Sequence, residues 1–115
     1  MLNQYKEVAG KASVTNAGAS AELMAAPGAG KKIRLVGGIV NVTVAATGGG
    51  GVVSIKDGST VIASYPASAI GSYVISFGSE NGYPMTANTA INVVAESAIT
   101  NQASANVAAV GYIAG

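Results

Sequence analysis

Hydrophobic and polar residues alternate with a period of two along most of this chain. In the segment 31–46, Ile33 and Leu35 fall on one side of an extended backbone, and Lys32 and Arg34 fall on the other. Successive side chains of a β-strand point to opposite faces of the sheet. The alternation therefore predicts a strand with one buried face and one basic face.

The alternation changes phase at the glycine pair Gly37-Gly38. After this pair the apolar positions are Val40, Val42 and Val44. A phase change at adjacent glycines predicts either a β-bulge or a bend that carries the chain from one sheet to another. A single straight strand buried on both faces is the alternative.

A β-hairpin is predicted in the middle of the chain. Two runs rich in β-forming residues, 52–56 and 59–65, flank the dipeptide Asp57-Gly58. Such a dipeptide is a strong hairpin signal because glycine adopts a positive φ without steric cost.

Three further segments have the composition of strands, namely 72–77, 89–96 and 105–113. A second turn is predicted at Asn81-Gly82, between the first two of them. The last segment is apolar on both faces, which indicates an inner strand or a strand covered by a neighbouring molecule.

The first part of the chain leaves more alternatives open. Residues 1–27 fit either an extended N-terminal arm or the first strands of the domain, and 20–27 fit a short strand or one helical turn before Pro27. No segment has the pattern of a helix of ten or more residues. We therefore expect an all-β protein of seven or eight strands: a single antiparallel β-sandwich over residues 28–115, with jelly-roll or Greek-key connections and an extended N-terminal arm.

The composition is apolar, and the few charges are unevenly distributed. The 115 residues are 50% hydrophobic and 10% charged, against about 25% charged in an average soluble domain. The charges of residues 1–34 sum to +3, whereas residues 35–115 carry four charges that sum to −2: Lys56, Asp57, Glu80 and Glu96. Such a surface either meets another subunit or is covered by neutral Ser, Thr and Asn side chains.

Several functional classes are disfavoured by the residue types. The chain has no histidine and no cysteine, so thiolate and imidazole metal sites and a Ser–His pair cannot form. The carboxylates lie in separate segments without a calcium-loop spacing. We therefore expect no enzymatic activity and no cofactor.

Charge and hydropathy also argue against two kinds of partner. The formal net charge of +1 gives no strong field for nucleic acid or anionic lipid. The N-terminus lacks the pattern of a signal peptide. The uncharged segment 35–55 contains Asn41, Thr43 and four consecutive glycines and alternates with period two, so it does not read as a membrane-spanning helix. Binding to nucleic acid or to a membrane is not expected.

The residues Lys31, Lys32 and Arg34 form a basic cluster with a candidate role, to which Lys6 and Lys11 add further positive charge. Basic side chains at the start of a strand fit a contact with an acidic partner surface, where charges at the rim mainly set the encounter rate. A solvated strand end is the structural alternative.

Four features together resemble small tailed-phage virion proteins of the jelly-roll type, the capsid decoration or cement proteins. They are the basic strand start Lys31-Lys32-Ile33-Arg34, the Asp57-Gly58-Ser59 hairpin, the Gly82-Tyr83-Pro84 turn and the apolar final strand. The resemblance covers about residues 28–115 and transfers no functional residue.

The resemblance implies a structural virion protein of a bacteriophage, made in the host cytoplasm. Such a protein would bind the major capsid protein on the outer surface of the capsid, between capsomers, and would reinforce the shell as a trimer. The alternative is a jelly-roll head-fibre or adhesin module that binds a receptor or a glycan. The low aromatic content and the absence of tryptophan weaken the glycan alternative.

Overall fold

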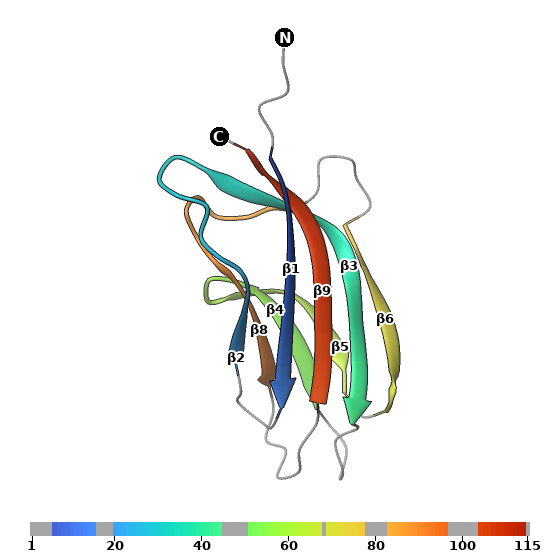
Figure 1. Cartoon of the computed structure of the whole chain (residues 1–115). Coiled ribbons are helices and arrows are strands. Elements are labelled where there is room, and N and C mark those ends of the chain that lie inside the picture. The colour runs from blue at the N-terminus through green and yellow to red at the C-terminus, as the bar shows by residue number, and fades with distance from the viewer. Residues whose placement is uncertain are drawn as a thin grey trace.

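All regular structure in the described part of the chain is β-structure (Figure 1). The computed structural model describes residues 6–15, 20–44, 51–67, 69–77, 83–96 and 104–114. The strands are β1 (Lys6–Thr15), β2 (Ser20–Met24), β3 (Lys32–Val44), β4 (Val52–Asp57), β5 (Thr60–Pro66), β6 (Gly71–Ser76), β7 (Tyr83–Pro84), β8 (Ile91–Glu96) and β9 (Ser104–Ala114). None of these described segments is a helix long and apolar enough to cross a membrane.

The strands form two antiparallel sheets that face each other (Figure 1). Sheet A has the order β1-β9-β3-β6, and β7 pairs with β3 off this path. Sheet B has the order β2-β8-β4-β5. The predicted all-β antiparallel sandwich is confirmed.

The core lies between the inner faces of the two sheets. In β8 the alternating residues Ile91, Val93 and Ala95 are buried, as the sequence pattern predicts. The facing residues of β3 and β9 are buried in the same way, among them Val40 and Val107. Removing a large aliphatic side chain from water contributes about 1.5–3 kcal/mol, so this apolar layer is the main stabilising element of the sandwich.

The phase change in β3 comes from a β-bulge. The pairing of β3 with β9 shifts register between Leu35 and Gly37. The bulge therefore lies immediately before the glycine pair Gly37-Gly38. Leu35 before the shift and Val40 after it are both fully buried. The strand continues within sheet A to Val44, so the chain does not bend into the other sheet there. The alternation of buried side chains ends at Val42. The side chain of Val44, which continues the apolar pattern in the sequence, is exposed.

The predicted hairpin is formed by β4 and β5, but its turn lies one residue further along the chain. Asp57 pairs with Thr60, so Gly58 and Ser59 make the loop. Gly58 has a φ of 61° at the first loop position, where both favoured two-residue hairpin turns require a positive φ. Asp57 belongs to β4 because its side chain is engaged elsewhere, as described below.

Most of the described residues of the N-terminal segment 1–27 form strands, which was one of the two predicted alternatives. Residues 6–15 form β1, which pairs along its whole length with β9, and residues 20–24 form β2. Ala12 and Val14 of β1 and Leu23 of β2 are buried in the core, which explains why these segments join the sheets. Residues 1–5 and 16–19 lie outside the described residues.

The other predicted strands correspond to β6, β8 and β9. β9 is an inner strand, between β1 and β3, which agrees with its apolar character on both faces. The two-residue strand β7 raises the number above the expected seven or eight. The predicted turn at Asn81-Gly82 lies outside the described residues.

Candidate interaction surfaces

The outer face of sheet A has an apolar centre. Lys11, Ala108, Ile39 and Val74 stand opposite one another on the four strands and form one row across the sheet. Directly opposed residues share a face of the sheet. The exposed fractions of Ile39 and Val74 are 42% and 75%, and that of Val110, on the next outward row, is 46%. Sheet A thus presents branched apolar side chains to its surroundings.

Small side chains make this centre slightly concave. A shallow depression of about 500 Å³ lies on it. The residues that line the depression belong to β1, β3 and β9: Ala9, Gly10, Lys11, Gly38, Ile39, Ala108, Ala109 and Val110. Its lining is almost entirely apolar, which suits a contact with another apolar surface better than a polar ligand.

A neutral polar row borders the apolar centre on one side. Ser13, Asn106, Asn41 and Ser72 stand opposite one another across the four strands. Ser13 Oγ donates to Asn106 Oδ1 at 2.6 Å, and Ser72 Oγ donates to Asn41 Oδ1 at 3.1 Å. This end of the face therefore supplies hydrogen-bonding groups without charge.

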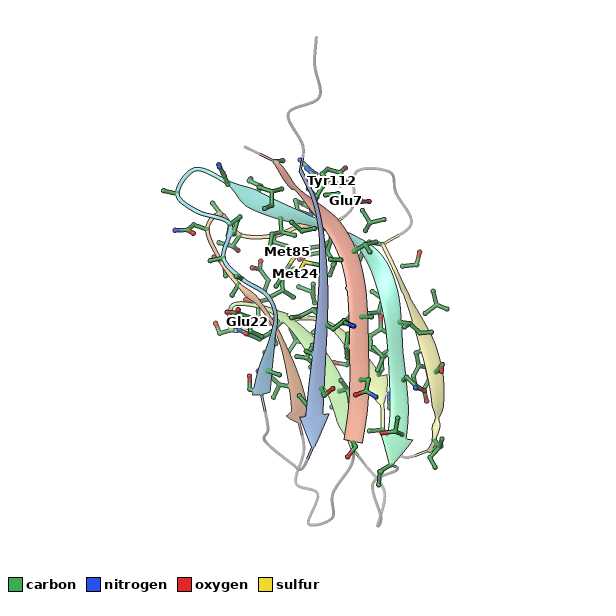
Figure 2. The ribbon with its side chains drawn as sticks, in the orientation of Figure 1. Glu7, Glu22, Met24, Met85 and Tyr112 are labelled. Atoms are coloured by element: carbon green, nitrogen blue, oxygen red, sulfur yellow. The ribbon has the colours of Figure 1, made fainter. Side chains whose placement is uncertain are left out.

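The basic cluster borders the same centre on the other side. Arg34 stands opposite Tyr112 of β9, which in turn stands opposite Glu7 of β1; Figure 2 shows Glu7 and Tyr112 at this end of the sheet. Lys32 lies two residues before Arg34 and is exposed, whereas Arg34 is half-buried. The predicted alternation of Lys32 and Arg34 against a buried Ile33 is confirmed. Lys31 precedes the strand and is exposed.

A short hydrogen-bonded loop fixes the position of Lys31. The Lys31 N–H donates to Gly28 O at 3.1 Å, and Lys31 O accepts from the Asn88 N–H at 2.7 Å. Asn88 Oδ1 also accepts from the Gly28 N–H at 2.9 Å. Asn88 has a φ of 48°, a left-handed conformation that asparagine tolerates better than most residues. The basic cluster therefore starts from a defined turn.

Asp57 ties this loop region to the β4–β5 hairpin. Its Oδ2 accepts from the Thr86 N–H at 2.9 Å and from Thr86 Oγ1 at 2.8 Å. The adjacent Gly58 N–H donates to Ala90 O at 3.2 Å. These bonds engage the carboxylate in holding two loops together, and they give Asp57 a structural role.

The outer face of sheet B carries charged residues on one row. Glu22, Asn92 and Lys56 stand opposite one another on β2, β8 and β4. On the neighbouring row, Ser54 and Ser64 share a hydrogen bond of 3.0 Å between their Oγ atoms, and Ser54 is fully buried. Val61 of β5 stands opposite Lys56 and is exposed, so this row combines charged and apolar side chains. The row through the centre of sheet A carries charge only at Lys11.

Aromatic rings close the sandwich along the side where β5 and β6 lie. Tyr65 of β5 and Tyr73 of β6 contact each other with ring centroids 5.8 Å apart, and Phe77 and Tyr83 contact each other at 5.3 Å. Burial raises the pKa of the Tyr65 hydroxyl above its usual value of 10.0 by desolvating the phenolate. These rings act as packing anchors between the sheets, as do Met24 and Met85, which lie in the core (Figure 2).

No constellation for metal binding is present among the described side chains: no three Asp or Glu residues gather there. Sequence analysis singled out Lys31, Lys32 and Arg34, and the structure brings the last two to one face. Sequence analysis did not single out Ile39, Val74 and Val110. The sequence signal for an exposed apolar side chain is a pair of consecutive apolar residues within a strand, such as Ile39-Val40, because one member of such a pair faces outward.

Comparison with solved structures shows a likeness in fold. The chain is similar to a solved chain described as belonging to the Cyanophage Pam1 capsid asymmetric unit, with a TM-score of 0.57 and 18% sequence identity. The likeness covers 95% of this chain and 84% of that chain. At this identity it shows that the fold is shared. No family model and no curated protein matches the chain.

Proposed function

We propose that this protein is a structural component of a bacteriophage virion, a decoration or cement protein that binds the outer surface of the capsid and reinforces it. The observation that carries the proposal is the likeness in fold, over 95% of the chain, to a chain of a cyanophage capsid asymmetric unit. In this proposal the partner is the major capsid protein, and the protein is made in the host cytoplasm and resides on the capsid surface.

The strand order supports the jelly-roll type. Leaving the two-residue β7 aside, eight strands remain, in the sheets β1-β9-β3-β6 and β2-β8-β4-β5. With β7 left out, β8 follows β6 along the chain. The chain then passes from one sheet to the other at every step except from β4 to β5. This order is that of the eight-stranded jelly roll, a fold used by viral capsid proteins.

The outer face of sheet A supports a role in assembly. Its apolar centre, with Ile39, Val74 and Val110 exposed, is removed from contact with water only when another surface covers it. Contacts of this kind need neither catalysis nor a cofactor. We propose no enzymatic activity, no cofactor and no binding to nucleic acid or to a membrane. The three-fold association that the sequence resemblance implies would form, in this proposal, on the shell.

Binding to particles tests the role of the basic cluster, Lys31, Lys32 and Arg34. We expect the triple variant Lys31→Ser, Lys32→Ser, Arg34→Ser to bind particles that lack the protein roughly tenfold more weakly at low salt, because each charge at an interface rim contributes about 0.2–1 kcal/mol. Its binding should also depend less on ionic strength. Co-sedimentation with the particles over a range of salt concentrations measures both effects.

Lys56→Ser is the control, since it removes a basic residue from the outer face of sheet B. It should bind particles as the natural protein does. If the triple variant binds unchanged at every ionic strength, the basic cluster does not face the capsid. If the natural protein itself fails to co-sediment and instead binds host cells or glycans, the decoration function is wrong.

A further inference from the structure

The edge strand β6 lacks the features that usually protect a sheet edge. A strand at an edge presents unpaired N–H and C=O groups to any other chain, and proteins block such edges with charged residues or proline. Of the other edge strands, β1 carries Lys11, β2 carries Glu22 and β5 carries Pro66. β6 (Gly71–Ser76) carries neither charge nor proline, and it forms the open side of sheet A in Figure 1.

Exposed apolar side chains accompany this edge. Val74 has an exposed fraction of 75%, and Ile70, just before the strand, has 71%. These are the two highest fractions among the exposed large hydrophobic residues of the described part of the chain. No charged residue occurs between Asp57 and Glu80, so β6 and the residues that flank it in the sequence bring no charge of their own to a second chain.

We propose that β6 pairs with β6 of a second copy of this protein, antiparallel and about a two-fold axis perpendicular to sheet A. The pairing joins sheet A of one copy to sheet A of the other and forms one continuous sheet across the dimer. The occupant is a second copy because the sequence of β6 is complementary to itself in this arrangement. An antiparallel strand pair of identical chains also satisfies the self-complementarity that a two-fold interface requires.

The register follows from the faces of the strand. Ser72, Val74 and Ser76 alternate with Tyr73 and Ile75, and Ile75 is buried on the inner face. A two-fold axis perpendicular to the sheet keeps outer residues beside outer residues. Centred on Val74, it sets Val74 opposite its own copy, Ser72 opposite Ser76 of the partner copy, and Tyr73 opposite Ile75 of the partner copy.

In this register no opposed pair is unfavourable. The apolar pair at position 74 covers the most exposed large hydrophobic side chain in the described part of the protein, and the serine pairs on either side of it are small and uncharged. The paired strands are about 20 Å long, so the interface is small and the dimer weak, with a dissociation constant on the order of micromolar. The inference does not depend on the proposed capsid function.

Analytical ultracentrifugation of the natural protein and of Val74→Lys tests the pairing. At about 100 µM the natural protein should sediment mainly at twice the 11.2 kDa mass of the chain. Val74→Lys opposes two like charges and should weaken association by roughly tenfold or more. Because this side chain is exposed in the single chain, the variant should remain folded, with the melting temperature of the natural protein at concentrations where both are monomeric.

Charge exchange tests the register itself. At a concentration near the dissociation constant of the natural protein, Val74→Lys and Val74→Glu should each be mainly monomeric alone, and an equimolar mixture of the two should restore the dimer, since position 74 meets position 74. Val110→Lys is the matched control: it places the same charge on the outer face of sheet A, but on the inner strand β9, and should leave the dimer unchanged.

Cross-linking supplies an independent measurement. The chain has no cysteine, so Val74→Cys introduces a single thiol. Opposed Cα atoms in antiparallel strands lie about 4.5–5.5 Å apart, within reach of a disulfide. Oxidation should convert Val74→Cys to a covalent dimer and leave Val110→Cys largely uncross-linked. A natural protein that stays monomeric at about 100 µM, or an association whose dissociation constant Val74→Lys does not change, overturns the proposal.

Discussion

Replacing Ile33 by alanine is expected to lower the free energy of unfolding by about 2–5 kcal/mol. Ile33 lies on the inner face of β3, with an exposed fraction of 1%. Its side chain packs in the cluster that both sheets share, and truncation leaves a cavity that the surrounding side chains fill only in part. For a domain with a typical stability of about 5–15 kcal/mol, this loss is a large fraction of the total.

Ile39→Ala is the matched control for Ile33→Ala, because it removes the same atoms from the same strand. Ile39 points outward, on the far side of the bulge, so its truncation should cost less than about 1 kcal/mol. Urea denaturation at one protein concentration measures both variants. Equal losses of stability would contradict the change of phase that the bulge introduces into β3.

Replacing Gly10 by alanine is expected to destabilise the protein by about 1–3 kcal/mol or more. A Cβ atom at this position of β1 would collide with the backbone carbonyl of Leu23 in β2. The two strands belong to opposite sheets, so their close approach closes this side of the sandwich. A backbone oxygen cannot rotate away as a flexible side chain can, and β1 and β2 would have to separate.

Gly71→Ala is the control for Gly10→Ala. No heavy atom lies within 4 Å of a Cβ built at Gly71. The same substitution should there be neutral or stabilising by up to about 1 kcal/mol, because alanine restricts the unfolded chain. Thermal unfolding followed by circular dichroism compares the two variants. A similar change in melting temperature for both would show that β1 and β2 are not in close contact.

The sequence predicted the strands wherever one face is buried and the other polar. β8 is the clearest case, with Ile91, Val93 and Ala95 alternating as expected, and the bulge in β3 was signalled by the glycine pair. The turn of the β4–β5 hairpin was placed one residue too early. Asp57 lies in the strand because it bonds Thr86, a residue 29 positions away, and a local turn signal contains no information about such a contact.

Sheet membership was less accessible from the sequence than strand position. Ser13 and Asn106 share a hydrogen bond although 93 positions separate them, and nothing near either residue specifies that β1 pairs with β9. For the same reason the sequence could place Lys32 and Arg34 on one face of a strand but could not show that they border an apolar centre. Nor could it show that β6 is an edge, because an edge is defined only by the order of all strands in the sheet.

The proposed reinforcement of the capsid makes a direct prediction about particle stability. A protein that binds the assembled shell and not its separated subunits stabilises the shell by mass action. Particles without this protein should therefore still assemble, but they should release their packaged genome at a lower temperature than particles that carry it.

The decisive measurement is a thermal-release curve for the packaged genome, recorded with a DNA-binding dye on particles that lack the protein, before and after the purified protein is added back. The proposed function predicts that addition moves the release curve to a higher temperature, and that the shift saturates as the binding sites fill. Coincident curves at a concentration where the protein co-sediments with the particles would contradict it.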